Sequence, residues 1–318
     1  MFEQALAEER SILKIKVGSH LYGTNTPTSD EDFVGIFIPT ADYLLGLKRI
    51  EEVDIGVKNK DEAGKNTADA VDCKFYTLEK FARLALDNNP NIIEILFVNE
   101  ESVVSIKEIG IQLLSLKKSF LSKNLKHRFL GYAFSQKHKM VIKLDNYETL
   151  VEASKYLERC DKRFVLEAVE IDHYPLFVKK KDYVSIGDIN LPITSTTKRA
   201  KEFVDRRLSQ FGSRLELVTK YGYDTKFASH LIRLIVEGIE LLSTGDLIFP
   251  LKEAPLLRDI RQGKYSMDDV LKMAEEYERA IEVLYESSSL SHSSDFETVQ
   301  NFVVNTHLNA LFQDGVIR

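Results

Sequence analysis

The first hundred residues alternate short apolar strands with helical segments. Ile12–Val17 places apolar residues at alternate positions with lysines between them, which is typical of a half-buried strand. Phe33–Ile38 and Val71–Tyr76 are two more short apolar stretches, which we interpret as strands. Periodic apolar residues predict helices over Phe2–Arg10 and Leu78–Leu86.

After Ser105 the apolar positions recur mainly at helical spacing. The predicted helices are 106–116, 122–144, 149–168, 196–211, 226–242 and 267–285. A weaker strand-like stretch lies around 174–189, and the serine-rich stretch 286–294 is a predicted linker. The pattern therefore predicts an α+β domain over residues 1–115, with a short mixed sheet and flanking helices, followed by a mostly helical domain over 116–318.

Composition excludes several classes of protein. The chain has 318 residues with a net charge of -6, so it is not a polycation that coats nucleic acid. Cys73 and Cys160 are its two cysteines, too few for a disulfide scaffold or a four-cysteine zinc site. The acidic start shows no signal peptide, and no apolar run reaches the length of a membrane span. We therefore expect a soluble, cytoplasmic protein without a membrane partner.

Carboxylates gather at the start of the second predicted strand. On an extended segment Asp30 and Asp32 point to one face, while Glu31 points to the other. Asp72 is the second residue of a later strand that could pair nearby and bring a third carboxylate to the same face. Carboxylate oxygens suit Mg²⁺ or Mn²⁺, and three of them together are typical of two-metal phosphoryl transfer. The alternative is a solvated turn, the common structure of an isolated Asp-x-Asp.

The wider motif resembles a known group of proteins. Gly18-Ser19, a ten-residue spacer and Asp30-Glu31-Asp32 resemble the signature of the DNA polymerase β-like nucleotidyltransferase superfamily. The stretch 18–39, with Asn89–Phe97 behind it, resembles a subgroup associated with RNA ligases and RNA repair. Shorter matches lie at 131–139, 226–234 and 260–266, whereas 150–222 matches nothing and is interpreted as a possible elaboration.

The resemblance implies a role for each residue of the motif. Residues 1–115 would be a minimal polymerase-β-like catalytic domain in which Asp30, Asp32 and Asp72 hold Mg²⁺, or Mn²⁺, and Asp72 helps to deprotonate the acceptor. Gly18 and Ser19 would cradle phosphate. Tyr22 and Ser29, in the same motif, are assigned to the nucleotide.

One predicted helix carries a polar face. Lys226, His230, Arg233 and Glu237 follow at steps of four, three and four residues. The face is either the solvated side of a core helix or a set of ligands for the nucleotide triphosphate. The resemblance favours the second for Lys226 and Arg233. His230 is also assigned to the nucleotide site, although a structural, hydrogen-bonded histidine is the more common case.

A cationic band lies over residues 116–143, where lysines, arginine and histidines alternate with aromatic residues. It is either an ordinary solvated helix face or a surface for RNA phosphates.

Together these features predict a metal-dependent nucleotidyltransferase. It would move a nucleoside monophosphate from an NTP, such as ATP, to an acceptor hydroxyl with release of pyrophosphate, and the expected acceptor is RNA. The alternatives are an enzyme that adds AMP to a protein and a non-catalytic nucleotide- or RNA-binding module. If the strand register is right, replacement of Glu31 by alanine is tolerated and replacement of Asp30 or Asp32 is not.

Overall fold

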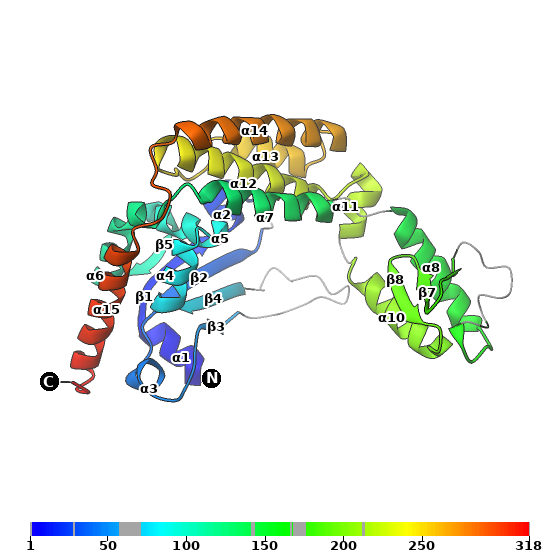
Figure 1. The fold of residues 1–318 in the computed structure, drawn as a ribbon, viewed down its shortest axis with the longest axis horizontal. Coiled ribbons are helices and arrows are strands. Elements are labelled where there is room, and N and C mark those ends of the chain that lie inside the picture. The colour runs from blue at the N-terminus through cyan, green and yellow to red at the C-terminus, as the bar shows by residue number, and fades with distance from the viewer. Residues whose placement is uncertain are drawn as a thin grey trace. The chain divides into compact units, whose positions relative to one another are not determined.

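The computed structural model describes residues 2–27, 29–56, 71–140, 144–165, 167, 176–211 and 214–317. These residues form two compact units (Figure 1). Unit 1 contains the described residues of 1–138 and 226–318, and unit 2 contains those of 139–225. This division differs from the expected boundary at 115/116, because residues 226–318 cluster with the N-terminal part of the chain in one unit. The stretch 150–222, which matches no motif, lies inside unit 2.

Unit 1 is built on a five-stranded mixed sheet with the order β3-β4-β2-β1-β5. The strands are β1 Ser11–Val17, β2 Glu31–Phe37, β3 Glu52–Asp54, β4 Val71–Thr77 and β5 Val103–Ile106. β2 and β4 are parallel, and the other pairs are antiparallel. Gly35 in β2 leaves room for the Phe75 ring of β4, which a Cβ atom would approach to 2.2 Å. The expected α+β class with a short mixed sheet is confirmed.

Helices flank this sheet and form most of the rest of unit 1. They are α1 Phe2–Glu9, α2 Ser19–Tyr22, α3 Ala41–Leu44, α4 Leu78–Leu86, α5 Pro90–Ile93, α6 Glu108–Ser115, α7 Leu125–Met140, α12 Thr225–Thr244, α13 Ala254–Arg261, α14 Met267–Ser287 and α15 Phe296–Gln313, with the 3₁₀ turns η1 Glu94–Phe97, η2 Glu100–Ser102 and η3 Lys117–Phe120. Figure 1 shows α7, α12, α13 and α14 stacked as one group, while α15 packs against α4 and η3.

Local sequence explains where several of these helices begin. The Thr77 hydroxyl accepts a hydrogen bond from the Lys80 amide and caps α4. Asn89 caps α5 in the same way, with Pro90 at the first helical position. Ser266 and Asp269 cap α14 reciprocally, with 3.1 Å between each side-chain oxygen and the amide that it accepts from.

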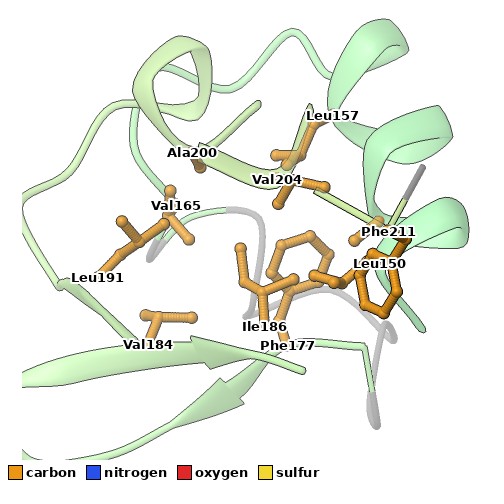
Figure 2. Packing of buried hydrophobic residues seen from close by; sticks show 11 residues of the cluster. Leu150, Leu157, Val165, Phe177, Val184, Ile186, Leu191, Ala200, Val204 and Phe211 are labelled. Carbon is orange, nitrogen blue, oxygen red and sulfur yellow. The ribbon is translucent and has the colours of Figure 1, made fainter. Parts of the chain in front are cut away.

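Unit 2 has a core of its own between two helices and a small sheet. Its elements are α8 Leu144–Arg159, β6 Val178–Lys179, β7 Tyr183–Ile186, β8 Ile189–Pro192, α10 Thr197–Ser209 and α11 Arg214–Tyr221. Figure 2 shows Phe177, Val184 and Ile186 facing Leu150 and Val204 in a continuous apolar cluster. The strand-like stretch predicted around 174–189 corresponds to this small sheet.

The structure differs from the predicted elements in several places. The helix predicted over 149–168 is α8, which starts at Leu144 and ends at Arg159. β3, β5, α13 and α15 were not predicted. The short strands offer only three or four residues of pattern, and α15 is apolar on its exposed side as well, with Phe312 63% and Phe296 57% exposed. The polar stretch 58–68, whose composition is typical of an exposed loop, lies outside the described residues. Within them, no helix is long and apolar enough to span a bilayer.

Candidate active site

Strand pairing brings two of the predicted carboxylates together. Asp32 of β2 and Asp72 of β4 are register partners in the parallel pair. Neighbouring strands lie about 4.8 Å apart, and partners in register point to the same face. Asp30 directly precedes β2. The strand that carries Asp72 therefore pairs with the strand of the Asp-x-Asp motif, as the sequence suggested that it could.

Gly18 packs directly against the Asp32 carboxylate. β1 pairs Val17 with Asp32, so the turn that follows β1 passes over this side chain. Gly18 has φ 69° and ψ -143°, a conformation that is almost restricted to glycine. A Cβ atom at this position would lie 2.5 Å from Asp32 Oδ2. Glycine is thus required here twice, by backbone conformation and by the close approach to the carboxylate.

Several charged residues affect the pKa of Asp32. Burial raises the pKa of Asp32, and the negative charges of Asp30 and Asp72 raise it further. Lys226 and then His20 oppose this rise in pKa. Asp30, Asp72, Lys226 of α12 and His20 of α2 therefore all act electrostatically on Asp32 in unit 1.

Glu31 lies on the other face of the strand. Its carboxylate is exposed and forms an ion pair with Lys16 of β1, with 2.6 Å between Nζ and Oε1. The hydrogen bond from Lys16 lowers the pKa of Glu31. The separation of Glu31 from its two neighbours agrees with the predicted strand register.

Hydrogen bonds within the loop between α2 and β2 stabilise its conformation. The carbonyl of Ser19 accepts hydrogen bonds from the amides of Thr24 and Asn25, at 2.9 and 3.1 Å. The Ser29 hydroxyl accepts one from the Thr26 amide at 2.9 Å. In the structure Ser29 therefore shapes the turn that leads into Asp30, and its assignment to the nucleotide stays a prediction.

The polar face of α12 divides into two parts. Lys226 is exposed and His230 half-buried, whereas Arg233 is 4% and Glu237 0% exposed. Arg233 Nη1 donates to Glu94 of η1 at 2.8 Å and to both oxygens of Glu237 at 3.0 Å. The simple alternative of a solvated face thus does not describe α12, because its second half buries these charges.

Tyr22 belongs to the same buried group. Its hydroxyl donates to the Glu94 carboxylate, with distances of 2.9 and 3.0 Å to the two oxygens. The Arg233 guanidinium stacks on its ring at 4.3 Å from the centroid. Tyr22 and Arg233, both assigned to the nucleotide from the sequence, contact each other and Glu94. Their assignment to the nucleotide stays a prediction.

Three cations of the band form ion pairs within the fold. Lys117 pairs with Asp246 at 2.8 Å, Lys126 pairs with Glu282, and Arg128 pairs with Asp87. Lys126 also lies 4.5 Å from the Tyr285 ring centroid. These contacts join η3 and α7 to α14 and other parts of unit 1. They favour the structural interpretation of this band over an RNA surface.

Two residues near the site were not assigned from the sequence. His20 follows Gly18-Ser19 directly, and its Nε2 atom is buried without a hydrogen-bond partner among the described residues. Glu94 lies in the predicted 89–97 motif and is 4% exposed. A charged residue within the apolar run IIEILF was the signal for Glu94. An apolar helix with one acidic residue needs a buried cation to balance it.

The side chains of Asp30, Asp32 and Asp72 do not converge as a set of metal ligands. Within the described ranges, no three His, Cys, Asp or Glu side chains are arranged so that they could hold a metal ion. Their donor chemistry nevertheless suits a hard divalent cation, since all three offer oxygen and repel one another as like charges.

Similarity to known proteins shows the family of this chain. A 38.9 kDa protein of the nrdC–mobD intergenic region of Enterobacteria phage T4 is 26% identical over 296 residues, which are 84% of this chain and 87% of the phage protein. The crystal structure of a nucleotidyltransferase-like protein from Exiguobacterium sibiricum aligns with all of this chain and 90% of its own at 9% identity, but its TM-score of 0.27 is too low to support a common fold. Residues 3–279 match a family described as the RNA repair pathway DNA polymerase beta family. The chain therefore belongs to the RNA repair pathway DNA polymerase beta family.

Proposed function

We propose that unit 1 is a metal-dependent nucleotidyltransferase that moves a nucleoside monophosphate from an NTP to an acceptor hydroxyl and releases pyrophosphate. The observation that carries this proposal is the register pair of Asp32 and Asp72, with Asp30 near enough to raise the Asp32 pKa. Family membership supports the same chemistry.

The three carboxylates would hold Mg²⁺, or Mn²⁺, at this edge of the sheet. Their oxygen donors and mutual repulsion favour a divalent cation, although their side chains would have to close around it. When bound, such an ion would neutralise charge on the triphosphate and on the leaving pyrophosphate. Asp72, at the start of β4, would also accept the proton of the attacking hydroxyl.

Other residues near Asp32 would bind and orient the nucleotide. Lys226 is exposed and acts on Asp32 electrostatically, so its ammonium group would pair with a phosphate. Gly18 lies where β1 ends, beside Asp32, and its backbone and the hydroxyl of Ser19 would contact the same phosphates. His230, one turn after Lys226, would lie beside the nucleotide.

RNA is the proposed acceptor. The family name refers to an RNA repair pathway, and a 3′-terminal ribose supplies the hydroxyl that this chemistry requires. In the 116–143 band, Lys117, Lys126 and Arg128 already pair with carboxylates of the fold.

The experiment is a transfer assay with each α-³²P-labelled NTP, Mg²⁺ or Mn²⁺, and pooled RNA, with products separated on denaturing gels. We expect label on RNA with wild type and none with Asp30→Ala/Asp32→Ala. Label on polypeptide would instead identify a protein-modifying enzyme. Metal-dependent NTP binding without transfer to any pool would favour a non-catalytic binding module.

A further inference from the structure

We propose that Tyr22, Glu94 and Arg233 form a buried tie that positions the Gly18-Ser19 turn and the start of α12 relative to Asp32. Tyr22 and Arg233 would then be positioning residues rather than nucleotide ligands. The effect on catalysis rests on the proposed function, whereas the mechanical coupling does not.

The tie joins three elements that are far apart in the sequence. Tyr22 comes from α2, Glu94 from η1 and Arg233 from α12. The Glu94 carboxylate lies between the other two, accepting the Tyr22 hydroxyl at 2.9 Å and Arg233 Nη1 at 2.8 Å. The stacking of Arg233 on Tyr22 closes the triangle. Loss of any one member would leave a buried polar group without its partner.

Tyr22 and Arg233, the two ends of the tie, each lie on an element that also carries or adjoins a residue of the candidate site. Tyr22 ends α2, and four residues before it Gly18 packs against the Asp32 carboxylate. Arg233 follows Lys226 by seven residues on α12, about 10 Å along the helix axis. A shift of Arg233 relative to Tyr22 would therefore move Lys226 relative to Asp32.

The composition of the tie argues for a role in placement. Arg233 is shared by two buried carboxylates, Glu94 and Glu237, and its Nε atom has no partner among the described residues. Burial of such charges costs free energy, and apolar residues of similar volume often stabilise a fold as well or better. Directional hydrogen bonds, in contrast, fix the relative position of three elements more narrowly than apolar packing does.

Backbone contacts hold α2 from its other side. The Tyr22 carbonyl accepts the Leu251 amide at 3.3 Å, and Arg258 of α13 donates to the Gly23 carbonyl. Gly23 itself lies close to Pro250, where a Cβ atom would approach Pro250 Cβ to 2.7 Å. These contacts hold α2 in unit 1. The hydrogen bond from the Tyr22 hydroxyl to Glu94 then fixes the position of α2 relative to α12.

Tyr22→Phe is the test variant, because it keeps the ring and its stacking on Arg233 and removes only the hydroxyl. Tyr43→Phe is the matched control, since the Tyr43 hydroxyl also donates to a glutamate, Glu3, at 3.3 Å but on the surface of α3. Amide hydrogen exchange measures the coupling without any assay of activity. Steady-state transfer of labelled NMP measures its effect on catalysis.

We expect Tyr22→Phe to speed exchange at least about threefold in both 18–25 and 225–233, while Tyr43→Phe changes neither segment. We also expect kcat to fall about 10- to 100-fold, as for other small displacements of reacting groups, with a change in KM of less than about threefold.

Faster exchange confined to 18–25 would overturn the coupling. Faster exchange in both segments with an unchanged kcat would overturn the positioning role. If wild type transfers no nucleotide, the proposed function fails, and the exchange data alone decide whether the tie couples the two segments.

Discussion

At the scale of single residues, the candidate site depends on Gly18 as much as on the carboxylates. The glycine has φ 69° and lies in contact distance of Asp32 Oδ2. A side chain there would displace the carboxylate or the turn. Gly18 therefore determines how closely the backbone after β1 approaches Asp32.

Gly18→Ala should lower the rate of NMP transfer by more than its loss of unfolding free energy accounts for. The positive φ alone costs about 1–3 kcal/mol, and the added methyl group also collides with Asp32. Gly315→Ala is the matched control, because Gly315 has the same φ of 69° with nothing near its Cβ position. Urea unfolding and the transfer assay would be measured for both. Equal losses of activity in the two variants would contradict this role of Gly18.

The sequence correctly predicted which face a residue occupies where a single periodicity determines that face. The two-residue period of a strand places Asp32 and Glu31 on opposite faces, and the structure confirms this in the Glu31–Lys16 ion pair. The burial of Arg233 was not predicted. Helical spacing places Arg233 on the same face as Lys226 but does not show which part of that face is buried. The burial of Arg233 depends on Glu94, which is 139 residues away.

At the scale of elements, α12 joins the candidate site to the core of unit 1. Its first turn carries the exposed Lys226, and its middle buries Arg233 and Glu237 against η1 and α2. Burial raises the pKa of Glu237 to about 8, although the positive charge of Arg233 opposes the rise. The same burial raises the pKa of Glu94.

This pKa predicts a dependence of stability on pH. Glu237 titrates near its ordinary value of about 4.3 in the unfolded chain and near 8 in the folded protein. Between these values the folded state binds the extra proton, so its stabilising contribution is complete at low pH and is lost as the pH rises through about 8. Glu237→Gln should show a smaller fall in unfolding free energy between about pH 6 and pH 8.5 than wild type, measured by urea unfolding. An identical fall in both proteins would contradict the assignment.

Element-scale prediction failed where the apolar pattern was short or lay on both sides. β3 has three residues, of which only Val53 is buried. α15 buries Val303 and Leu311 but exposes Leu308 and Phe312, so no single apolar face marks it as a helix. The strongly one-sided helices α4, α12 and α14 were all predicted.

At the scale of the whole molecule, each of the two units has an apolar cluster of its own among the described residues. Phe75 belongs to a cluster around the sheet of unit 1, and Phe177 belongs to the cluster of unit 2. The sequence did not reveal this division, because the helices of the two units have similar patterns. The chain leaves unit 1 near the end of α7 and returns to it at α12.

Separate cores should unfold in separate transitions. Phe75→Ala and Phe177→Ala should each destabilise one unit by about 3–5 kcal/mol through loss of packing and the cavity left behind. In differential scanning calorimetry each variant should shift a different transition. A single transition that moves equally in both variants would show that the two units unfold as one.

The most direct test of the nucleotidyltransferase assignment compares Asp32→Asn with Glu31→Gln in the same transfer assay. The two residues are neighbours in β2, and each variant removes one negative charge with little change in size. If Asp32 holds the catalytic cation, Asp32→Asn should lower NMP transfer by about 100-fold or more, the effect of several kcal/mol of lost charge stabilisation. Glu31→Gln, which breaks only the exposed pair with Lys16, should remain within about threefold of wild type. Full activity of Asp32→Asn, or a larger loss in Glu31→Gln, would contradict the proposed site.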